Sequence, residues 1–397
     1  MAANFLPYGR HTIEEDDIEA VVDVMRNGLL TAGPKAAEFE KAFASHIGVK
    51  EAVVVSNGTT ALHLAVIVAG IGPGDVVVVP AITFLSTANV VEMVGAQVAF
   101  ADVNPETGLM TLDNFKDAIA DANGSVKAVM PVHLTGHSEQ MAEINTYAKK
   151  LGIKVITDCC HALGAEYIGG GKPGDGQFED FGCYSLHPVK SIAMGEGGVV
   201  TTNDPEAAEK MRLMRSHDMH RNEESFLHDE MAMDTSGQAN PWYYEMHQLG
   251  YNYRATDMQC ALGLSQLKKL DSFVGKRRKL ALCYDDALKP LGNLIKSNRK
   301  SGDCLSAWHL YAVQIDFEAV GVSRATMMKK LSGMGIGTQV HYIPVSSQPY
   351  YRKKYGVQNL PGGEEYYSKS LSLPLFPQME EADIKRVVEA LNEVLMS

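Results

Sequence analysis

The sequence predicts an α/β protein in which helices cover both faces of a mostly parallel sheet, followed by a smaller α+β unit. Strand-like and helix-like segments alternate over the first two thirds of the chain. Most of the strand-like segments are apolar throughout, as in strands that are buried on both faces. A single core rarely grows beyond about 250–300 residues, so a chain of 397 residues is expected to form two domains. We expect a large domain at 1–265 and a small one at 266–397, with the N-terminal segment packing on the small domain.

Short apolar runs predict the strands, and apolar residues at helical spacing predict the helices. The strands expected in the large domain are 53–55, 76–79, 97–101, 128–132, 154–157, 181–185 and 198–202. The helices expected there are 12–26, 38–47, one that starts at Thr60, 86–94, 112–120 and 139–151. One long helix is expected from Asp257 through Leu270, then strands at 310–315 and 338–342 and helices at 324–334 and 381–395.

The composition excludes several classes of partner. The net charge of -12 would repel nucleic acid and anionic membranes. No apolar run is long enough to cross a bilayer, and the first residues do not resemble a secretory signal. The six cysteines form no CxxC pair, which favours reduced thiols, no metal site and a cytoplasmic location. Residues 218–242 are polar and irregular, and a loop of this length is usually functional or mobile.

Two charged residues stand where chemistry is expected. Asp158 follows an apolar strand, and ligands of doubly wound sheets gather at the carboxyl ends of strands. A carboxylate there can pair with a cationic ring nitrogen, although a helix cap is the more ordinary role. Lys190 follows another strand and precedes the glycine-rich Gly195–Gly198. A confined lysine becomes a nucleophile suited to Schiff-base chemistry, whereas a solvated loop lysine is the common alternative.

Two further segments are informative only in combination with these. The turn Ser56–Thr60 (Ser-Asn-Gly-Thr-Thr) precedes a helix, and backbone N–H groups at a helix start can bind phosphate. An ordinary helix N-cap has the same sequence pattern, so this segment alone does not indicate phosphate binding. The segment Leu249–Arg254 (Leu-Gly-Tyr-Asn-Tyr-Arg) is an aromatic and polar loop ahead of the long helix.

These four segments, in this order, resemble the DegT/DnrJ/StrS sugar aminotransferases. The resemblance extends from Gly28 to Leu375, and the runs Ser185–Lys190 (Ser-Leu-His-Pro-Val-Lys) and Gly250–Arg254 are its most specific parts. It implies the type I fold of transferases that depend on pyridoxal 5′-phosphate (PLP), with a seven-stranded sheet in the large, PLP-binding domain. Within the family the chain is most similar to surface-glycan keto-sugar transaminases, such as the pseudaminic acid pathway enzyme and ArnB.

The resemblance also implies roles for individual residues. Lys190 would form the Schiff base with PLP and carry the proton, and Asp158 would pair with the pyridine nitrogen. The remaining cofactor residues would be Gly58, Thr59, Thr60 and Ser185 at the phosphate, Phe84 on the ring, His161 beside it, and Asn252 reaching the cofactor of a partner subunit in a homodimer. The substrate side would be lined by His187, Arg254, His309, Tyr311 and His341, for which structural roles are an equal alternative.

The expected activity is an aminotransferase that moves an amino group from L-glutamate to a keto sugar in bacterial surface polysaccharide (lipopolysaccharide or similar glycan) biosynthesis. PLP would cycle through pyridoxamine phosphate. The acceptor would be a nucleotide-linked keto hexose or a free keto sugar acid such as 8-oxo-3-deoxy-octulosonate. The alternatives are a noncatalytic PLP-fold regulator, which the intact Lys190 and Asp158 argue against, and a dinucleotide oxidoreductase, for which the first strand lacks the GxGxxG spacing.

Overall fold

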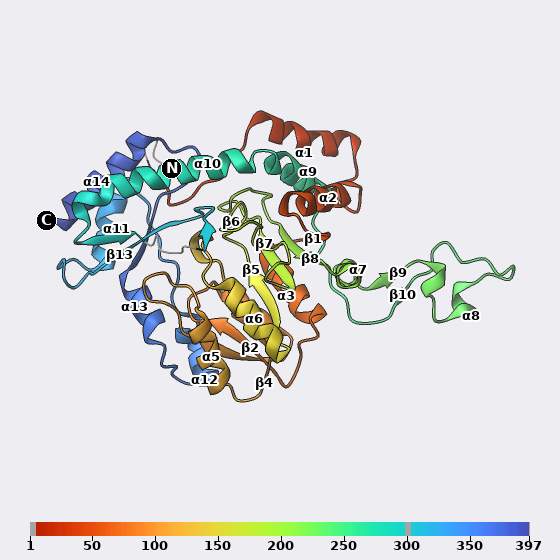
Figure 1. Cartoon of the computed structure of the whole chain (residues 1–397). Helices are drawn as coiled ribbons and strands as arrows, with labels where there is room; N and C mark the ends of the chain where they lie inside the picture. The colour runs from red at the N-terminus through yellow and green to blue at the C-terminus, as the bar shows by residue number, and fades with distance from the viewer. Residues whose placement is uncertain (1–4, 298–302, 397) are drawn as a thin grey trace.

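The large domain is built on one seven-stranded sheet (Figure 1). The computed structural model describes residues 5–297 and 303–396. The strand order is β1-β8-β7-β5-β4-β2-β3, and β8 alone runs antiparallel to its neighbours. The predicted seven-stranded, mostly parallel sheet is therefore confirmed. Its strands are β1 (Glu51–Val55), β2 (Asp75–Pro80), β3 (Gln97–Ala101), β4 (Ser125–Val129), β5 (Lys154–Asp158), β7 (Phe181–Ser185) and β8 (Gly198–Thr202).

Alternate side chains of one strand enter different cores, which explains why the strands are apolar throughout. In β1, Val53 and Val55 belong to the core that contains helix α3, whereas Val54 packs with the residues of α2 on the other face. The helices of the large domain are α1 (Glu15–Asn27), α2 (Lys35–Ile47), α3 (Gly58–Val68), α4 (Leu85–Met93), α5 (Leu112–Asp121), α6 (Met141–Leu151), α7 (Pro205–Met214) and α9 (Asp257–Leu267).

The long helix predicted from Asp257 is two helices. Helix α9 ends at Leu267, and α10 (Leu270–Leu288) begins after a turn in which the Lys269 amide donates to the Gln266 carbonyl. The ammonium of Lys269 lies 2.9 Å from the carboxylate of Asp17 on α1. The break therefore depends on a contact between distant segments, which helical spacing alone does not reveal.

The small domain packs helices against a three-stranded sheet. The strands β11 (Ile295–Ser297), β13 (Tyr311–Ile315) and β14 (Ser370–Leu373) lie in the order β11-β13-β14. Helices α10, α11 (Arg324–Gly333) and α14 (Glu381–Leu395) cover this sheet, and Leu6 from the N-terminal segment joins the same core. The segment that we expected to pack on the small domain thus places at least Leu6 in this core.

The strand predicted at 338–342 is wrong. Gln339 makes only an isolated bridge to Ser372, and the third strand of the small sheet is β14. The 338–342 segment instead directs His341 and Tyr342 toward the large domain, where the Tyr342 hydroxyl lies 3.2 Å from His161. Helices α12 (Pro349–Tyr355) and α13 (Pro361–Lys369) follow and return to the large domain.

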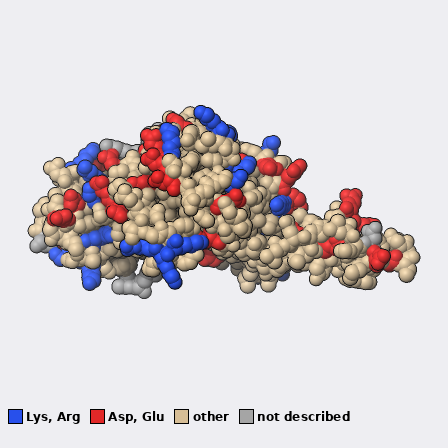
Figure 2. All heavy atoms as spheres, turned by 90° about the horizontal axis from the view of Figure 1, so that it is seen from below, with Lys and Arg blue, Asp and Glu red and all other residues tan. Residues whose placement is uncertain are grey.

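Residues 217–250 form an arm that projects from the body of the molecule beyond α7 (Figure 1). The expectation of an irregular loop is only partly correct, because β9 (Met219–His220) and β10 (Glu245–Met246) pair at its base and α8 (Asp229–Ala232) lies further out. Large apolar side chains are exposed along it: Leu227, Met231, Trp242, Tyr244, Met246 and Leu249. On the face shown in Figure 2 most of the arm is uncharged, with some acidic side chains.

One further short strand pair joins the two domains: β6 (Glu166–Tyr167) pairs with β12 (Cys304–Leu305). Among the described residues, no helix is long and apolar enough to cross a membrane.

Candidate active site

Two parallel neighbouring strands, β5 and β7, end at the same edge of the sheet. Asp158 is the last residue of β5, and its Cα partner in β7 is Cys183. Ser185 ends β7, two residues further along. This is the edge at which doubly wound sheets bind their ligands. The position expected for Asp158 is thus confirmed, and the loop that follows β7 carries Lys190 to the same edge.

The Asp158 carboxylate is buried and held by one hydrogen bond to each oxygen. The Thr87 hydroxyl donates to Oδ2 at 2.9 Å, and the Cys160 amide donates to Oδ1 at 3.0 Å. The hydroxyls of Thr83 and Thr87 lie 2.8 Å apart, so Thr83 can donate to Thr87 while Thr87 donates to Asp158. The sequence analysis did not find these two threonines, although Thr87 lies in the first turn of α4 just after strand β2.

Lys190 sits in an environment that favours its neutral amine. Its backbone amide donates to the His187 carbonyl at 2.8 Å, which closes a turn after β7. Burial lowers the pKa of the Lys190 ammonium, and the charges of Cys160 and Asp158 oppose that shift. Lys190 follows β7 and Asp158 ends the neighbouring β5 at the same edge, close enough for the charge of Asp158 to act on Lys190. A desolvated lysine beside a fixed carboxylate is suited to form a Schiff base.

The start of helix α3 lies against the end of β7. A Cβ atom on Gly58 would lie 2.8 Å from the Cβ of Ser185 and 3.3 Å from its hydroxyl oxygen, so only glycine permits this approach. The first N–H groups of a helix have no intrahelical acceptor, and here those of Gly58 and Thr59 begin the helix beside the Ser185 hydroxyl. Together these groups form a cradle for an anion.

The expectation that the Thr60 amide binds phosphate is not met in the structure. This N–H donates to the side chain of Asn57 at 2.9 Å, and the Thr60 hydroxyl lies 3.1 Å from the Asn57 amide. The two residues form a capping box, which fixes the first turn of α3. Thr60 therefore shapes the cradle rather than donating to it.

His161 is buried between two elements of different domains. The Thr135 amide donates to its Nδ1 at 3.3 Å, so the proton of the neutral ring belongs on Nε2, which lies 3.2 Å from the Tyr342 hydroxyl. Burial, followed by the charge of Lys190, lowers the pKa of His161 well below its ordinary value. The ring is therefore a neutral hydrogen-bond donor at physiological pH. Tyr342 was not found in the sequence analysis.

His309 and His341 join this cluster. The ring centroids of His161 and His309 are 4.3 Å apart. Burial is the main cause that lowers the pKa of His309 well below its ordinary value, and it lowers the pKa of His341 to about 3. His341 Nδ1 lies 2.8 Å from the Ser372 hydroxyl, and its ring contacts Tyr8. The charge of Lys190 acts on all three of these imidazoles.

Phe84 and His187 are both exposed. Phe84 is 55% exposed, and its ring centroid is 5.9 Å from that of Tyr342, which in turn contacts His161. An exposed aromatic ring next to Tyr342 can cover a flat ligand. His187 is also exposed, and its Nδ1 accepts a long hydrogen bond of 3.4 Å from the Val189 amide.

Tyr311 does not line the substrate side, and its expected role is wrong. Its ring is fully buried in the core of the small domain, stacked on Tyr284 and Trp308, and its hydroxyl donates to Asp285 at 2.8 Å. His309 lies before β13, directly after Trp308, whose φ of 49° interrupts the extended backbone, so the period of the strand does not relate its direction to that of Tyr311. The ring of His309 lies near that of His161, while Tyr311 enters the core of the small domain.

Asn252 and Arg254 lie on the loop that precedes α9. Asn252 is exposed and bridges Ser216, and Arg254 is partly buried beside it. The intervening Tyr253 accepts a hydrogen bond of 2.8 Å from the Ser56 amide, which ties this loop to the segment before α3. Among the described residues, no group of three or more His, Cys, Asp or Glu could hold a metal ion.

A lysine nucleophile, a fixed carboxylate and an anion cradle lie at one edge of a doubly wound sheet. This combination of fold and site is typical of aminotransferases that form a Schiff base with their cofactor. Residues 11–392 match the DegT/DnrJ/EryC1/StrS aminotransferase family, and the chain belongs to this family.

The relatives agree with this assignment over the whole chain. The chain is 38% identical to the spore coat polysaccharide biosynthesis protein SpsC of Bacillus subtilis, over 99% of this chain and 97% of that protein. It is 34% identical to the UDP-4-amino-4-deoxy-L-arabinose–oxoglutarate aminotransferase of Shewanella sediminis, over 100% of this chain and 99% of that protein.

Solved structures show the same fold. Helicobacter pylori PseC, an aminotransferase of pseudaminic acid biosynthesis, superposes with a TM-score of 0.87 at 27% identity and 99% coverage of both chains. The sugar aminotransferase Spr1654 of Streptococcus pneumoniae in its PMP form has a TM-score of 0.87 at 26% identity, over 98% of this chain and 99% of that one.

Proposed function

We propose that this aminotransferase uses PLP to move an amino group from L-glutamate to a keto sugar in the biosynthesis of a bacterial surface polysaccharide. The observation that carries the proposal is the placement of Lys190 and Asp158 in one site, beside the start of helix α3. A noncatalytic relative would not need a desolvated lysine beside a fixed carboxylate. The six cysteines, all free thiols, suit the reducing cytoplasm, where we place the reaction.

The residues of the site fit PLP. The close approach of Gly58 to Ser185 leaves a cradle that a side chain at position 58 would fill, and its N–H groups suit a phosphate. Phe84 would cover one face of the pyridine ring, and Asp158 would face the ring nitrogen. When bound, the cofactor supplies an aldehyde that condenses with amines and a ring that accepts electrons from the neighbouring carbon.

Each residue then has a defined task. The Lys190 amine, whose pKa is lowered by burial, takes a proton from the substrate carbon and returns it to the other side of the transferred nitrogen. Asp158 keeps a proton on the facing nitrogen through its negative charge, and Thr87 and the Cys160 amide hold the carboxylate in place. His161 carries no charge, and its Nε2 proton holds the hydroxyl of Tyr342 in position.

The acceptor is a keto sugar. The Shewanella relative's name includes a UDP-linked amino sugar and oxoglutarate, which supports a sugar acceptor and the glutamate–oxoglutarate pair. Neutral imidazoles such as those of His309 and His341 offer one donor and one acceptor each, which suits sugar hydroxyls. We propose a nucleotide-linked keto hexose as the acceptor, with a free keto sugar acid as the competing class that a screen would compare.

We also propose that the active unit is a homodimer with shared sites. Asn252 is exposed on the loop before α9, and an exposed amide there would be available to a partner's cofactor. The arm carries large exposed apolar side chains, including Trp242 at 73% exposure, and these need a second surface to cover them.

Spectroscopy of the purified holoenzyme tests the proposed function. The protein should be yellow, and L-glutamate should bleach the visible band while 2-oxoglutarate appears. Borohydride reduction should attach a pyridoxyl label to Lys190. The Lys190→Ala variant should lose turnover by at least about a thousandfold, because both the covalent attachment and the proton carrier are removed. Normal turnover by that variant would refute the mechanism.

A further inference from the structure

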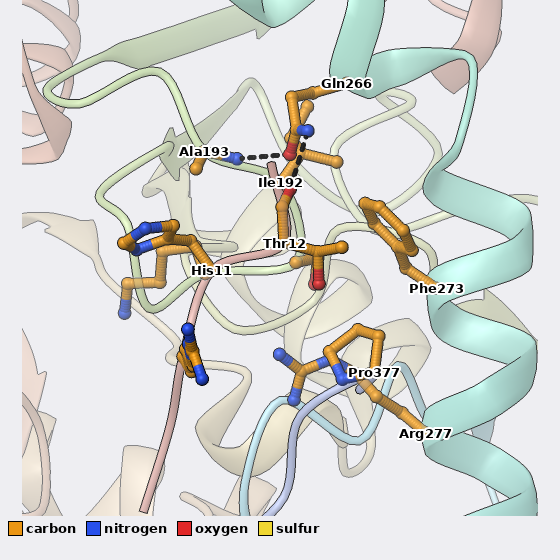
Figure 3. A pocket seen from close by; sticks show the side chains of 11 residues that line it. His11, Thr12, Ile192, Ala193, Gln266, Phe273, Arg277 and Pro377 are labelled. Atoms are coloured by element: carbon orange, nitrogen blue, oxygen red, sulfur yellow. Dashed lines mark hydrogen bonds between the residues drawn. The ribbon is translucent and has the colours of Figure 1, made fainter. Parts of the chain in front are cut away.

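Arg277 is a fully buried arginine of helix α10, 1% exposed. Its Nη1 donates to the backbone carbonyls of Leu375, His309 and Trp308 at 2.8, 3.2 and 3.4 Å. Figure 3 shows the side chain leaving α10 toward the segment that carries Pro377. One guanidinium therefore joins α10 to two segments that are far apart in the sequence.

The Arg277 guanidinium is charged although it is buried. Burial lowers the pKa of Arg277 only to about 10, so the group keeps its proton at neutral pH. A buried charge costs free energy that an apolar side chain in the same place does not cost. The three carbonyls recover part of this cost, because a charged donor forms the stronger kind of hydrogen bond. The function of the guanidinium is therefore to be sought in the segments that it holds.

One of these segments has a strained backbone. Trp308 has a φ of 49°, in the left-handed region that a bulky residue rarely adopts. Such a conformation persists only where the surrounding structure holds it in place. Arg277 holds the carbonyl of Trp308, and the Ser306 hydroxyl accepts from the Trp308 amide at 2.9 Å. Both the N–H and the carbonyl of the strained residue are thus fixed.

The strained residue directly precedes His309, whose ring lies in the active site. The ring centroids of His309 and His161 are 4.3 Å apart, and the charge of Lys190 acts on His309. The side chain is buried, and its Nδ1 has no partner among the described residues. Buried polar atoms in proteins almost always have a partner, so this nitrogen is suited to receive one from a ligand.

Arg278, the next residue of α10, holds the same segment further upstream. Its Nε donates to the Ser306 carbonyl at 3.0 Å, and its Nη2 donates to the carbonyls of Gly164 and Leu305 at 3.0 and 3.3 Å. Its acceptors in this segment therefore lie before the strained residue. Arg278 is a matched control, because it also fastens α10 to backbone carbonyls but does not hold the carbonyl of the active-site histidine.

We propose that Arg277 is a positioning residue for the reaction: it fixes the backbone of Trp308 and His309, so that the His309 imidazole faces the substrate. The guanidinium acts through the histidine and does not itself touch the substrate. This inference rests on the proposed function, which assigns the neutral imidazoles to the keto sugar.

NMR of the histidine side chains tests the positioning without a substrate. The holoenzyme carries isotope-labelled histidine, and the His309 signals are identified by their loss in His309→Gln. Arg277→Lys keeps the charge, but lysine ends one atom short of Nη1, so a shift of the His309 ring signals reports lost geometry rather than lost charge. This variant should shift them by more than a linewidth, whereas Arg278→Lys should leave them in place. Unchanged His309 signals in Arg277→Lys would overturn the proposal.

Circular dichroism checks that the variants fold. If Arg277→Lys does not fold, Arg277→Gln replaces it, because a neutral amide avoids the cost of a buried charge without its carbonyl partners. The same shift of the His309 signals is expected, and its absence would again overturn the proposal.

A double-mutant cycle tests whether Arg277 acts through His309. With L-glutamate and the keto sugar that the acceptor screen selects, Arg277→Lys and His309→Gln should each lower kcat/KM about tenfold, and Arg278→Lys should keep it. The double variant should be no slower than His309→Gln alone, since removing the imidazole removes the effect of its position. Losses that multiply to about a hundredfold would overturn action through His309.

The two hypotheses fail in different experiments. A wild-type holoenzyme that produces no 2-oxoglutarate from L-glutamate would refute the proposed function. The NMR comparison of Arg277→Lys with Arg278→Lys would still decide whether the guanidinium sets the position of His309.

Discussion

The hydroxyl of Thr87 donates to the Asp158 carboxylate, and the hydroxyl of Thr83 lies 2.8 Å behind it. In Thr87→Val the carboxylate loses this bond and keeps its contacts with Cys160. One lost hydrogen bond to a charged group corresponds to about 1.5 kcal/mol, so kcat/KM should fall roughly tenfold. Thr83→Val is the matched control and should cost less, because it leaves the bond to Asp158 in place. Equal kcat/KM values for the two variants would contradict this role.

Glu179 gives a prediction about pH. It is buried, the Gly176 amide donates to its Oε1 at 2.8 Å, and its Oε2 has no partner among the described residues. Burial raises the pKa of this carboxyl from 4.5 to about 8. The folded protein therefore keeps a proton that the unfolded chain releases. The resulting stabilisation is complete below pH 4.5, falls as the pH rises and is lost above about pH 8.

Glu179→Gln should remove this dependence, because an amide does not ionise. Urea unfolding should show similar stability of variant and wild type near pH 5, and a variant more stable by at least about 1 kcal/mol at pH 8. Glu143→Gln, at an exposed position on α6, should follow the wild type at both pH values. Parallel pH curves for wild type and Glu179→Gln would show that the buried carboxyl does not titrate as stated.

For single residues, the sequence analysis found those that lie in recognisable sequence motifs. Lys190 and Asp158 follow apolar strands in motifs that resemble a known family, so their positions could be predicted. Thr87 and Tyr342 could not, because each acts through a partner far away in the sequence. Tyr311 was misassigned since the motif did not reveal which face of its strand enters the core.

Among the elements, the start of helix α3 lies close against the end of β7. In Gly58→Ala the new methyl group would lie 2.8 Å from the Cβ of Ser185, so the helix start must move away from β7. The affinity for PLP should fall at least about tenfold, since phosphate contacts at a helix start depend on position. Gly72→Ala is the control, because no atom lies within 4 Å of the added Cβ there.

Titration of each apo-variant with PLP, followed by absorbance, would measure this effect, with circular dichroism to confirm an intact fold. Unchanged PLP affinity in Gly58→Ala would mean that the cradle is not the phosphate site.

The strands of the large sheet could be predicted because both faces are buried, which produces uninterrupted apolar runs such as Val76–Val79. The small domain was harder. Strand β14 (Ser-Leu-Ser-Leu) is short and half polar, yet all four residues are buried because β13 and the neighbouring helices cover it. Helices α12 and α13 were missed, since both are short and begin at a proline.

For the whole molecule, the arm is the surface through which we propose that the dimer forms. Trp242→Glu places a charge on its exposed apolar surface, and Leu282→Glu is the control on the exposed side of α10. Sedimentation of the wild type should show a dimer, and Trp242→Glu should weaken it at least about tenfold, because buried aromatic residues dominate interfaces. A Trp242→Glu protein that dimerises like the wild type would exclude the arm from the interface.

Active sites shared between two subunits lead to a separate prediction. Lys190→Ala and Asn252→Ala are each expected to be impaired, but a mixture that exchanges subunits would contain heterodimers with one intact site. About a quarter of the wild-type activity should return if the partner supplies Asn252, since half of the dimers are mixed and each has one complete site. No recovery after confirmed exchange would place Asn252 in its own chain's site.

If the active unit is the dimer proposed above, the strength of the contact made by the projecting arm sets the lowest concentration at which the enzyme can work. A solitary chain leaves Leu227, Met231 and Trp242 in contact with water, which favours aggregation with any apolar surface it meets. Assembly would then protect the chain as well as complete its sites. Dilution should consequently abolish turnover while each subunit is still folded, so specific activity would depend on how much enzyme the cell makes.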